Sequence, residues 1–140
     1  MSLSIYQRHL DTIPKQYRLL KLFRPPIYVI ELSNNQVSAV CYYKDGSSKR
    51  HQVNAAFSNR RMVIADFLSA VQAITDLLLK FPKHPFGISS FAVVNVTEEL
   101  IDGLTMIEIK AIREAVWAAS GQAKRRIVSS TVNYQGQVVS

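Results

Sequence analysis

Three extended segments joined by two short turns constrain the fold more than any other feature of this sequence. The first segment is almost continuously apolar, as is typical of a strand buried on both faces of a sheet. The pairs Asn34-Asn35 and Asp45-Gly46 separate the segments, and these residues tolerate the positive φ angles of two-residue hairpin turns. The sequence therefore predicts an antiparallel three-stranded meander. Its strands are expected at 27–32, 37–43 and 49–57.

Two amphipathic helices are predicted further along the chain. The first covers 66–81, where apolar residues recur at steps of four and three, and Asp66 is the expected N-cap. The second begins at Thr105, which forms a capping box with Glu108, and is expected to end at Gly121. Its predicted inward stripe comprises Ile109, Ile112, Val116 and Ala119.

Further extended segments at 88–96 and 125–130 give the element order βββαβαβ. Crossovers through a helix join parallel strands in a right-handed sense, so strands 1, 4 and 5 should be parallel, with the meander at the other edge. This order predicts an α/β ribonuclease-H-like layer, a mixed five-stranded sheet of order 3-2-1-4-5 with helices packed on it. The tail alternates apolar and polar residues at Val132, Tyr134 and Val138, and could add a strand to this sheet or to a neighbour's.

The chain of 140 residues is long enough for one domain. Residues 1–24 form a basic amphipathic leader that ends at two prolines, and 25–140 form the predicted single subdomain. Such a leader could lie on a membrane surface, dock on a partner or strap onto its own domain. Its candidate contact residues are Tyr17, Leu20, Lys21 and Phe23.

The net charge of +7 is concentrated near the N-terminus. Residues 1–61 hold ten Lys or Arg against three Asp or Glu, whereas 62–140 hold seven of each. A one-sided basic surface suits an anionic membrane, nucleic acid or an acidic partner. Nucleic acid is not the expected partner, because edge strands often carry cations simply to prevent aggregation. The candidate contact residues of the hairpin are Tyr42, Lys49 and Arg50, and that of the tail is Tyr134.

Two stretches resemble the bacterial rod-shape proteins of the MreB family. The segment "MVIADFLSAVQAITDLLLKF" at 62–81 is similar to the family's "GVIADF" segment, and "GLTMIEIKAIREA" at 103–115 is similar to the helix that follows in that family. The resemblance runs from about residue 23 to 130. It implies the actin and Hsp70 superfamily, but only the first subdomain, about a third of a full member.

The family's first phosphate loop has an altered counterpart here. Ser33 replaces the glycine whose missing Cβ lets backbone N–H groups approach a phosphate, and Glu31 replaces the family's Asp. Residues 129–131 provide no carboxylate where the resemblance implies a hydrolytic acid. We therefore expect no cofactor and no catalysis. The counterpart of the loop comprises Glu31, Leu32, Ser33, Asn34 and Asn35.

Other chemistry finds little support in the sequence. The carboxylates are too dispersed for a two-metal nuclease site, and the histidines lack metal-ligand spacing. A two-residue turn would pair Cys41 with Arg50 and bring His51 near, but a reactive dyad is not expected there. The carboxylates and histidines considered are Glu31, Asp66, Glu98, Glu99, Asp102, His9, His51 and His84.

The sequence thus predicts a non-catalytic protein that acts through protein–protein contact, which the resemblance connects with cell shape or the cytoskeleton. The expected partner is a second copy or a full-length actin-like protein. Two alternatives stay open: half of a split nucleotide-binding protein that a partner completes, or a basic accessory factor on a membrane surface or nucleic acid. No stretch approaches the length of a membrane span or a signal peptide, so the expected location is the cytoplasm, with peripheral contact at the inner membrane.

Overall fold

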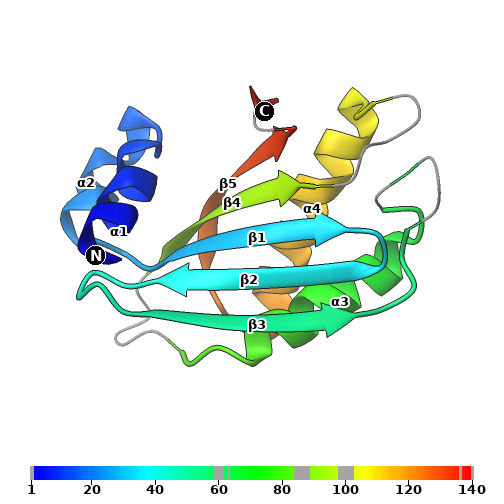
Figure 1. Ribbon diagram of the computed structural model, residues 1–140, viewed down its shortest axis with the longest axis horizontal. Coiled ribbons are helices and arrows are strands. Elements are labelled where there is room, and N and C mark those ends of the chain that lie inside the picture. Colours follow the sequence, from blue (N-terminus) through cyan, green and yellow to red (C-terminus); the bar gives the residue numbers. More distant parts are fainter. Residues whose placement is uncertain are drawn as a thin grey trace.

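The computed structural model describes residues 2–58, 62, 64–83, 89–97, 103–135 and 137–139. It contains two layers of helices on one twisted sheet (Figure 1). The strands are β1 Ile27–Ser33, β2 Gln36–Tyr42, β3 Ser48–Asn54, β4 Ser90–Val96, β5 Ile127–Tyr134 and β6 Gln137–Val138. The α-helices are α1 Ser2–Asp11, α2 Arg18–Leu22, α3 Phe67–Leu79 and α4 Met106–Ala123, with a 3₁₀ turn, η1, at Lys15–Tyr17.

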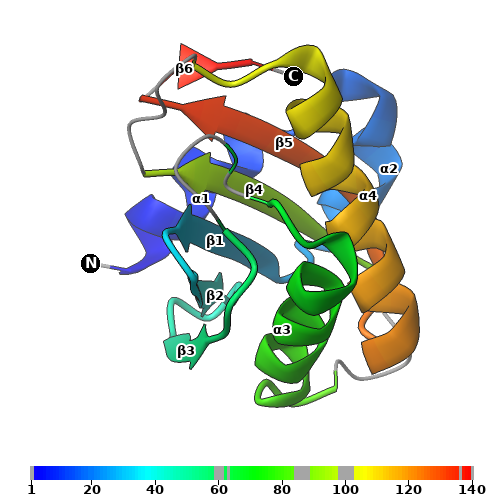
Figure 2. The same ribbon diagram turned by 90° about the vertical axis from the view of Figure 1, so that its right-hand side faces the viewer.

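The sheet has the order β3-β2-β1-β4-β5-β6. β1 pairs antiparallel with β2 and parallel with β4, and β4 pairs parallel with β5. These directions confirm the predicted α/β ribonuclease-H-like layer and its order 3-2-1-4-5. The tail adds a sixth strand, because β6 folds back antiparallel onto the end of β5. Figure 2 shows α3 and α4 side by side on one face of the sheet.

The main core lies between the sheet and the pair α3 and α4. Alternate residues of the central strand, Tyr28, Ile30 and Leu32, point into it and are fully buried. The inward face of α4 is the predicted stripe, which is confirmed: all four of its members are buried. Apolar residues at every second position of the strands therefore face apolar residues that repeat every 3.6 positions on the helices, as the sequence indicates.

A second apolar cluster lies on the opposite face, where the leader packs against the sheet. Tyr6, Leu10 and Ile13 are buried there against Ile27 and Phe91. The Tyr6 hydroxyl donates a hydrogen bond of 2.7 Å to the backbone oxygen of Pro25. The leader therefore packs on the end of the sheet where β1 and β4 begin (Figure 1). Packing on its own domain was one of the three alternatives predicted for the leader.

The predicted helix starts are confirmed, but the predicted end of α4 is wrong. The Asp66 side chain accepts from Ser69 N at 3.0 Å, and Thr105 and Glu108 form the expected capping box. Gly121, however, lies inside α4, which continues to Ala123. The left-handed capping position is taken by Lys124 at φ 55°. The helix runs on because Ala123 is buried in the main core, so packing outweighs the glycine signal.

The predicted two-residue turn at Asp45-Gly46 is also wrong. The connection runs from Tyr43 to Ser47, and Gly46 adopts φ 91°, which a residue with a Cβ rarely adopts. This longer loop shifts the pairing by one residue, so Cys41 lies opposite Lys49 rather than Arg50. Strand β3 also ends at Asn54, before the expected boundary, and Phe57 turns into the core.

Candidate functional site

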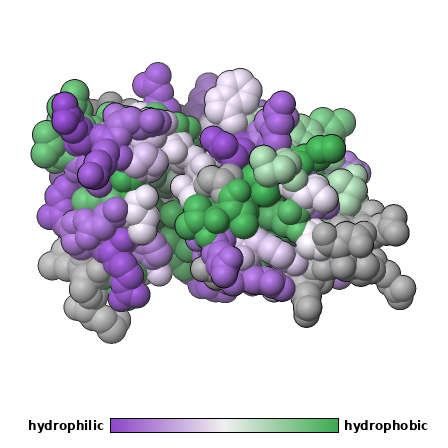
Figure 3. Space-filling view, turned by 90° about the horizontal axis from the view of Figure 1, so that it is seen from above, coloured by the Kyte–Doolittle hydropathy of each residue, from purple (hydrophilic) through white to green (hydrophobic). Residues whose placement is uncertain are grey.

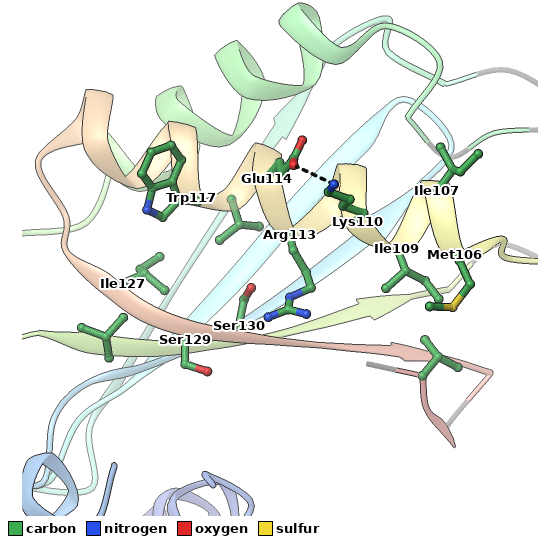
Figure 4. A pocket seen from close by; sticks show the side chains of 13 residues that line it. Met106, Ile107, Ile109, Lys110, Arg113, Glu114, Trp117, Ile127, Ser129 and Ser130 are labelled. Carbon is green, nitrogen blue, oxygen red and sulfur yellow. Dashed lines mark ion pairs between the residues drawn. The ribbon is translucent and has the colours of Figure 1, made fainter. Parts of the chain in front are cut away.

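A groove between α4 and β5 is the candidate site (Figure 4). It has a volume of about 820 Å³, and its walls come from α4, from residues 127–130 of β5 and from Val139. A second hollow of about 760 Å³ continues it past the end of α4. The two hollows share Trp117, Ile127 and Val128, so the second hollow adjoins the groove.

Large apolar side chains surround this groove without being buried. Met106, Ile107 and Trp117 are 78%, 79% and 74% exposed. Figure 3, which looks onto this edge of the sheet, shows hydrophobic side chains gathered across the middle of the face. A contiguous apolar patch on a folded domain commonly marks an interaction site.

The helical repeat explains why these residues face outward. Ile107, Lys110, Glu114 and Trp117 are spaced by three and four residues, so they lie on one face of α4. That face is separate from the buried stripe, which packs on the sheet. α4 is therefore apolar on its inner face and partly apolar at both ends of its outer face.

The polar groups of the groove are mainly cationic. Lys110 Nζ lies 4.0 Å from Glu114 Oε1, and both side chains are well exposed, so this pair is weak. The Arg113 side chain extends from α4 toward Ser130 (Figure 4). Lys124 and Arg126 line the second hollow.

Of the residues 31–35 that the resemblance aligns with a phosphate loop, 31–33 belong to β1, and Asn34 and Asn35 form the β1–β2 hairpin turn. Asn35 adopts φ 55°, and its Oδ1 accepts from the backbone N–H groups of Phe57 and Ser58 at 2.9 and 2.8 Å. Asn35 N in turn donates to Ser58 Oγ at 3.1 Å. The side chain of Asn35 therefore holds the chain that follows β3 against this turn.

Glu31 lies on the opposite face from α3 and α4, and it is exposed. Its neighbours across the sheet are Ser38 on β2 and Asn95 on β4. Asn133 Nδ2 donates to Asn95 Oδ1 at 2.9 Å. Nowhere in the described ranges do three His, Cys, Asp or Glu side chains gather as metal ligands would. Glu98, Glu99, Asp102 and His84 lie outside the described residues.

The contact residues predicted from the sequence do not form one site. The Tyr17 ring packs edge-on against Phe91 at 5.4 Å, and the Tyr42 ring stacks on His9 at 5.1 Å. Phe23, in contrast, is 67% exposed. Leu20 packs against the second apolar cluster, and its neighbour Lys21 is half-buried. Lys49 and Arg50 are exposed on the edge strand β3. Tyr134 is partly buried at the end of β5.

Cys41 is expected to be unreactive in the folded protein. It is fully buried, and burial raises the pKa of its thiol to about 12. Because the folded state favours the neutral thiol, Cys41 contributes its full stabilisation of the fold below about pH 9. That stabilisation is lost as the pH rises toward 12. A disulfide reagent at pH 8 should modify Cys41 only after urea unfolding. Rapid modification in native buffer would contradict its burial.

Sequence periodicity alone does not identify Ile107 and Met106 as part of a binding site. They precede the inward stripe, and their sequence pattern is the same as that of other residues in the first turn of a helix. The available signal was their apolar character at positions outside the stripe. Trp117 also lies outside the inward stripe, and its exposure excludes a place in the core.

Comparisons with known proteins show limited similarity. No protein-family model matches the sequence, and no curated protein matches it significantly. Among solved structures, the ethanolamine utilization protein EutJ from Carboxydothermus hydrogenoformans is 16% identical over 78% of this chain, with a TM-score of 0.47. The PPX-GPPA enzyme from Aquifex aeolicus is 12% identical over 79%, with a TM-score of 0.38. The chain covers 37% and 36% of those chains, a little over a third of their length.

Proposed function

We propose that this chain is a non-catalytic protein-interaction module and that the groove between α4 and β5 is its binding site. The observation that supports this proposal is the set of large apolar side chains at its rim, above all Trp117 at 74% exposure. Tryptophan contributes much of the binding energy at many interfaces because its side chain buries a large area and loses little conformational entropy. Covering this rim would remove from water an apolar surface that the folded chain leaves exposed.

The partner proposed from the resemblance is a second copy or a full-length actin-like protein, with a role in cell shape or the cytoskeleton. In a full-length member of the resembled family, further subdomains would cover surfaces that this chain exposes. A partner protein would take over that role here.

Affinity capture followed by direct binding tests this proposal. The baits are the wild-type chain, Ile107→Glu at the groove and Leu68→Glu on α3, which has the same 79% exposure but lies outside the groove. A protein retained by the wild type and by Leu68→Glu should be lost with Ile107→Glu. After purification, its affinity for Ile107→Glu should be at least about tenfold weaker by calorimetry.

Light scattering after size-exclusion chromatography covers the case in which the partner is a second copy. Self-association should then depend on Ile107 and not on Leu68. If neither a second copy nor any purified protein distinguishes the two variants, the groove is not the binding site.

The α2 region favours a second candidate, a membrane-surface factor. Leu19, Leu22 and Phe23 are 70%, 78% and 67% exposed, although they lie close together in the chain. Residues 12–30 contain four Lys or Arg and no Asp or Glu. Apolar side chains beside cations suit insertion at an anionic lipid surface. No helix within the described ranges is long and apolar enough to cross a bilayer.

Vesicle sedimentation tests this second candidate. Vesicles of phosphatidylcholine with phosphatidylglycerol should retain the wild type and Leu68→Glu, and should retain Leu22→Glu about tenfold less. Equal retention by vesicles of phosphatidylcholine alone, or retention unaffected by Leu22→Glu, would remove the candidate.

A further inference from the structure

We propose that the groove accepts an extended segment of a partner protein as an added strand on β5, and that this segment alternates apolar with acidic residues. The inference rests on the proposed function and specifies the binding mode and the chemistry of the partner.

The outer edge of β5 is open over most of its length. β4 pairs with β5 along its inner side, whereas β6 pairs only with Asn133 and Tyr134. Among the residues that the structure describes, no strand pairs with 127–131 on the outer side. This open edge of five residues is about 17 Å long at the usual rise per residue.

Backbone groups of β5 point toward this edge. The Val132 oxygen accepts from Val139 N at 2.9 Å, on the side where β6 lies. Alternate residues of a strand direct their backbone groups to the same side, so the N–H and C=O of Ser130 also point outward. The tail of this chain already uses the same edge for antiparallel pairing, and an added strand would extend that pairing into the groove.

The walls of the groove determine which kinds of side chain such a strand should carry. Successive side chains of a strand point to opposite faces. Those on the α4 side would meet Ile109, Val116 and Trp117, which line the groove from the helix. The side chains on that face are therefore expected to be apolar, with polar residues between them.

Charge decides in favour of acidic residues at the polar positions. The residues that line the groove and the adjoining hollow include four cations and one carboxylate, Glu114, which gives a net charge of four minus one, or +3. A second copy offers no acidic strand edge, since β5 contains no Asp or Glu and the other edge strand, β3, carries Lys49 and Arg50. The favoured occupant is therefore a segment of another protein. The four cations are Lys110, Arg113, Lys124 and Arg126.

Selection from a random twelve-residue peptide library on the full chain tests the inference. Selected peptides should alternate apolar and acidic residues and lack proline. Because Trp117 is the only tryptophan, its fluorescence reports directly on occupancy of the groove. A synthetic copy of the selected peptide should shift the Trp117 emission to shorter wavelength and slow amide exchange at Ser130.

Peptide backbone chemistry then separates strand addition from other modes without altering the protein. N-methylation of alternate peptide residues that face β5 should weaken binding at least about tenfold, and methylation of the intervening residues should not. Replacing the acidic residues with lysine should also weaken binding at least about tenfold, and added salt should reduce this difference. Ile107→Glu should weaken binding, whereas Leu68→Glu should not.

Other outcomes overturn the inference and leave the proposed function to be judged separately by protein capture. Selected peptides with apolar residues at helical spacing, indifferent to N-methylation, would show a groove that binds a helix instead. Preference for basic peptides would refute the charge argument. The inference would also be overturned if no selected peptide bound Ile107→Glu more weakly than the wild type. Self-association through the groove that prevents peptide binding would overturn it as well.

Discussion

Removal of residues 1–24 is expected to lower the free energy of unfolding by about 5 kcal/mol, because the leader contributes three buried side chains that each stabilise the fold by about 1.5–3 kcal/mol. Those side chains, Tyr6, Leu10 and Ile13, cover Ile27 and Phe91 on the sheet. Natural domains have only about 5–15 kcal/mol in total, so the shortened chain should be at the limit of folding. Urea denaturation followed by circular dichroism measures the difference.

Two point variants serve where the shortened chain fails to fold. Leu10→Ala, at a position 6% exposed, should cost about 3 kcal/mol. Leu19→Ala, in the same leader but 70% exposed, should change stability by less than about 0.5 kcal/mol. Equal, small effects of the two variants would contradict the packing of the leader on the sheet.

Arg125→Ala is expected to destabilise the protein by about 3 kcal/mol, because it leaves two carbonyl oxygens without their charged donor. Arg125 is 7% exposed. Its Nε and Nη2 donate to Phe81 O at 3.2 and 2.8 Å, and its Nη1 donates to Ala123 O at 2.7 Å. One guanidinium therefore joins the end of α3, the end of α4 and the beginning of β5.

The neighbouring arginine provides the matched control. Arg126 is exposed, and its backbone oxygen, which accepts from Ser90, is retained in any substitution. Arg126→Ala should therefore change the urea midpoint very little. Arg125→Lys should recover only part of the loss, since an ammonium group cannot reproduce the fork of a guanidinium. Similar midpoints for Arg125→Ala and Arg126→Ala would refute this role.

The central layer was predictable because its signals are local and agree with one another. The apolar run of β1, the cap at Asp66 and the capping box at Thr105 each determine one element with little help from the rest of the chain. The topology then follows from handedness. Elements whose ends depend on tertiary packing were less predictable: α4 passes Gly121, and the turn after Tyr42 shifts the register of β3.

The candidate groove was harder to predict than the fold. Its walls come largely from α4 and β5, and its apolar rim depends on which outward side chains of α4 the rest of the chain leaves uncovered. Periodicity identifies which residues of a helix face the core, but not whether the remaining apolar residues are covered by something else. Arg125 shows the same limit, because nothing in its sequence neighbourhood indicates that it reaches Phe81.

The parallel pairing of β1 with β4 has a consequence for the order of folding. Ile27 lies beside Phe91, 64 residues further along the chain, whereas β1 and β2 meet across a single turn. Closing the long loop costs chain entropy before any contact compensates for it. The β1–β2 hairpin is therefore expected to form early. Attachment of β4 should limit the rate, so substitutions at the β1–β4 contact should slow refolding more than equally destabilising ones in β3.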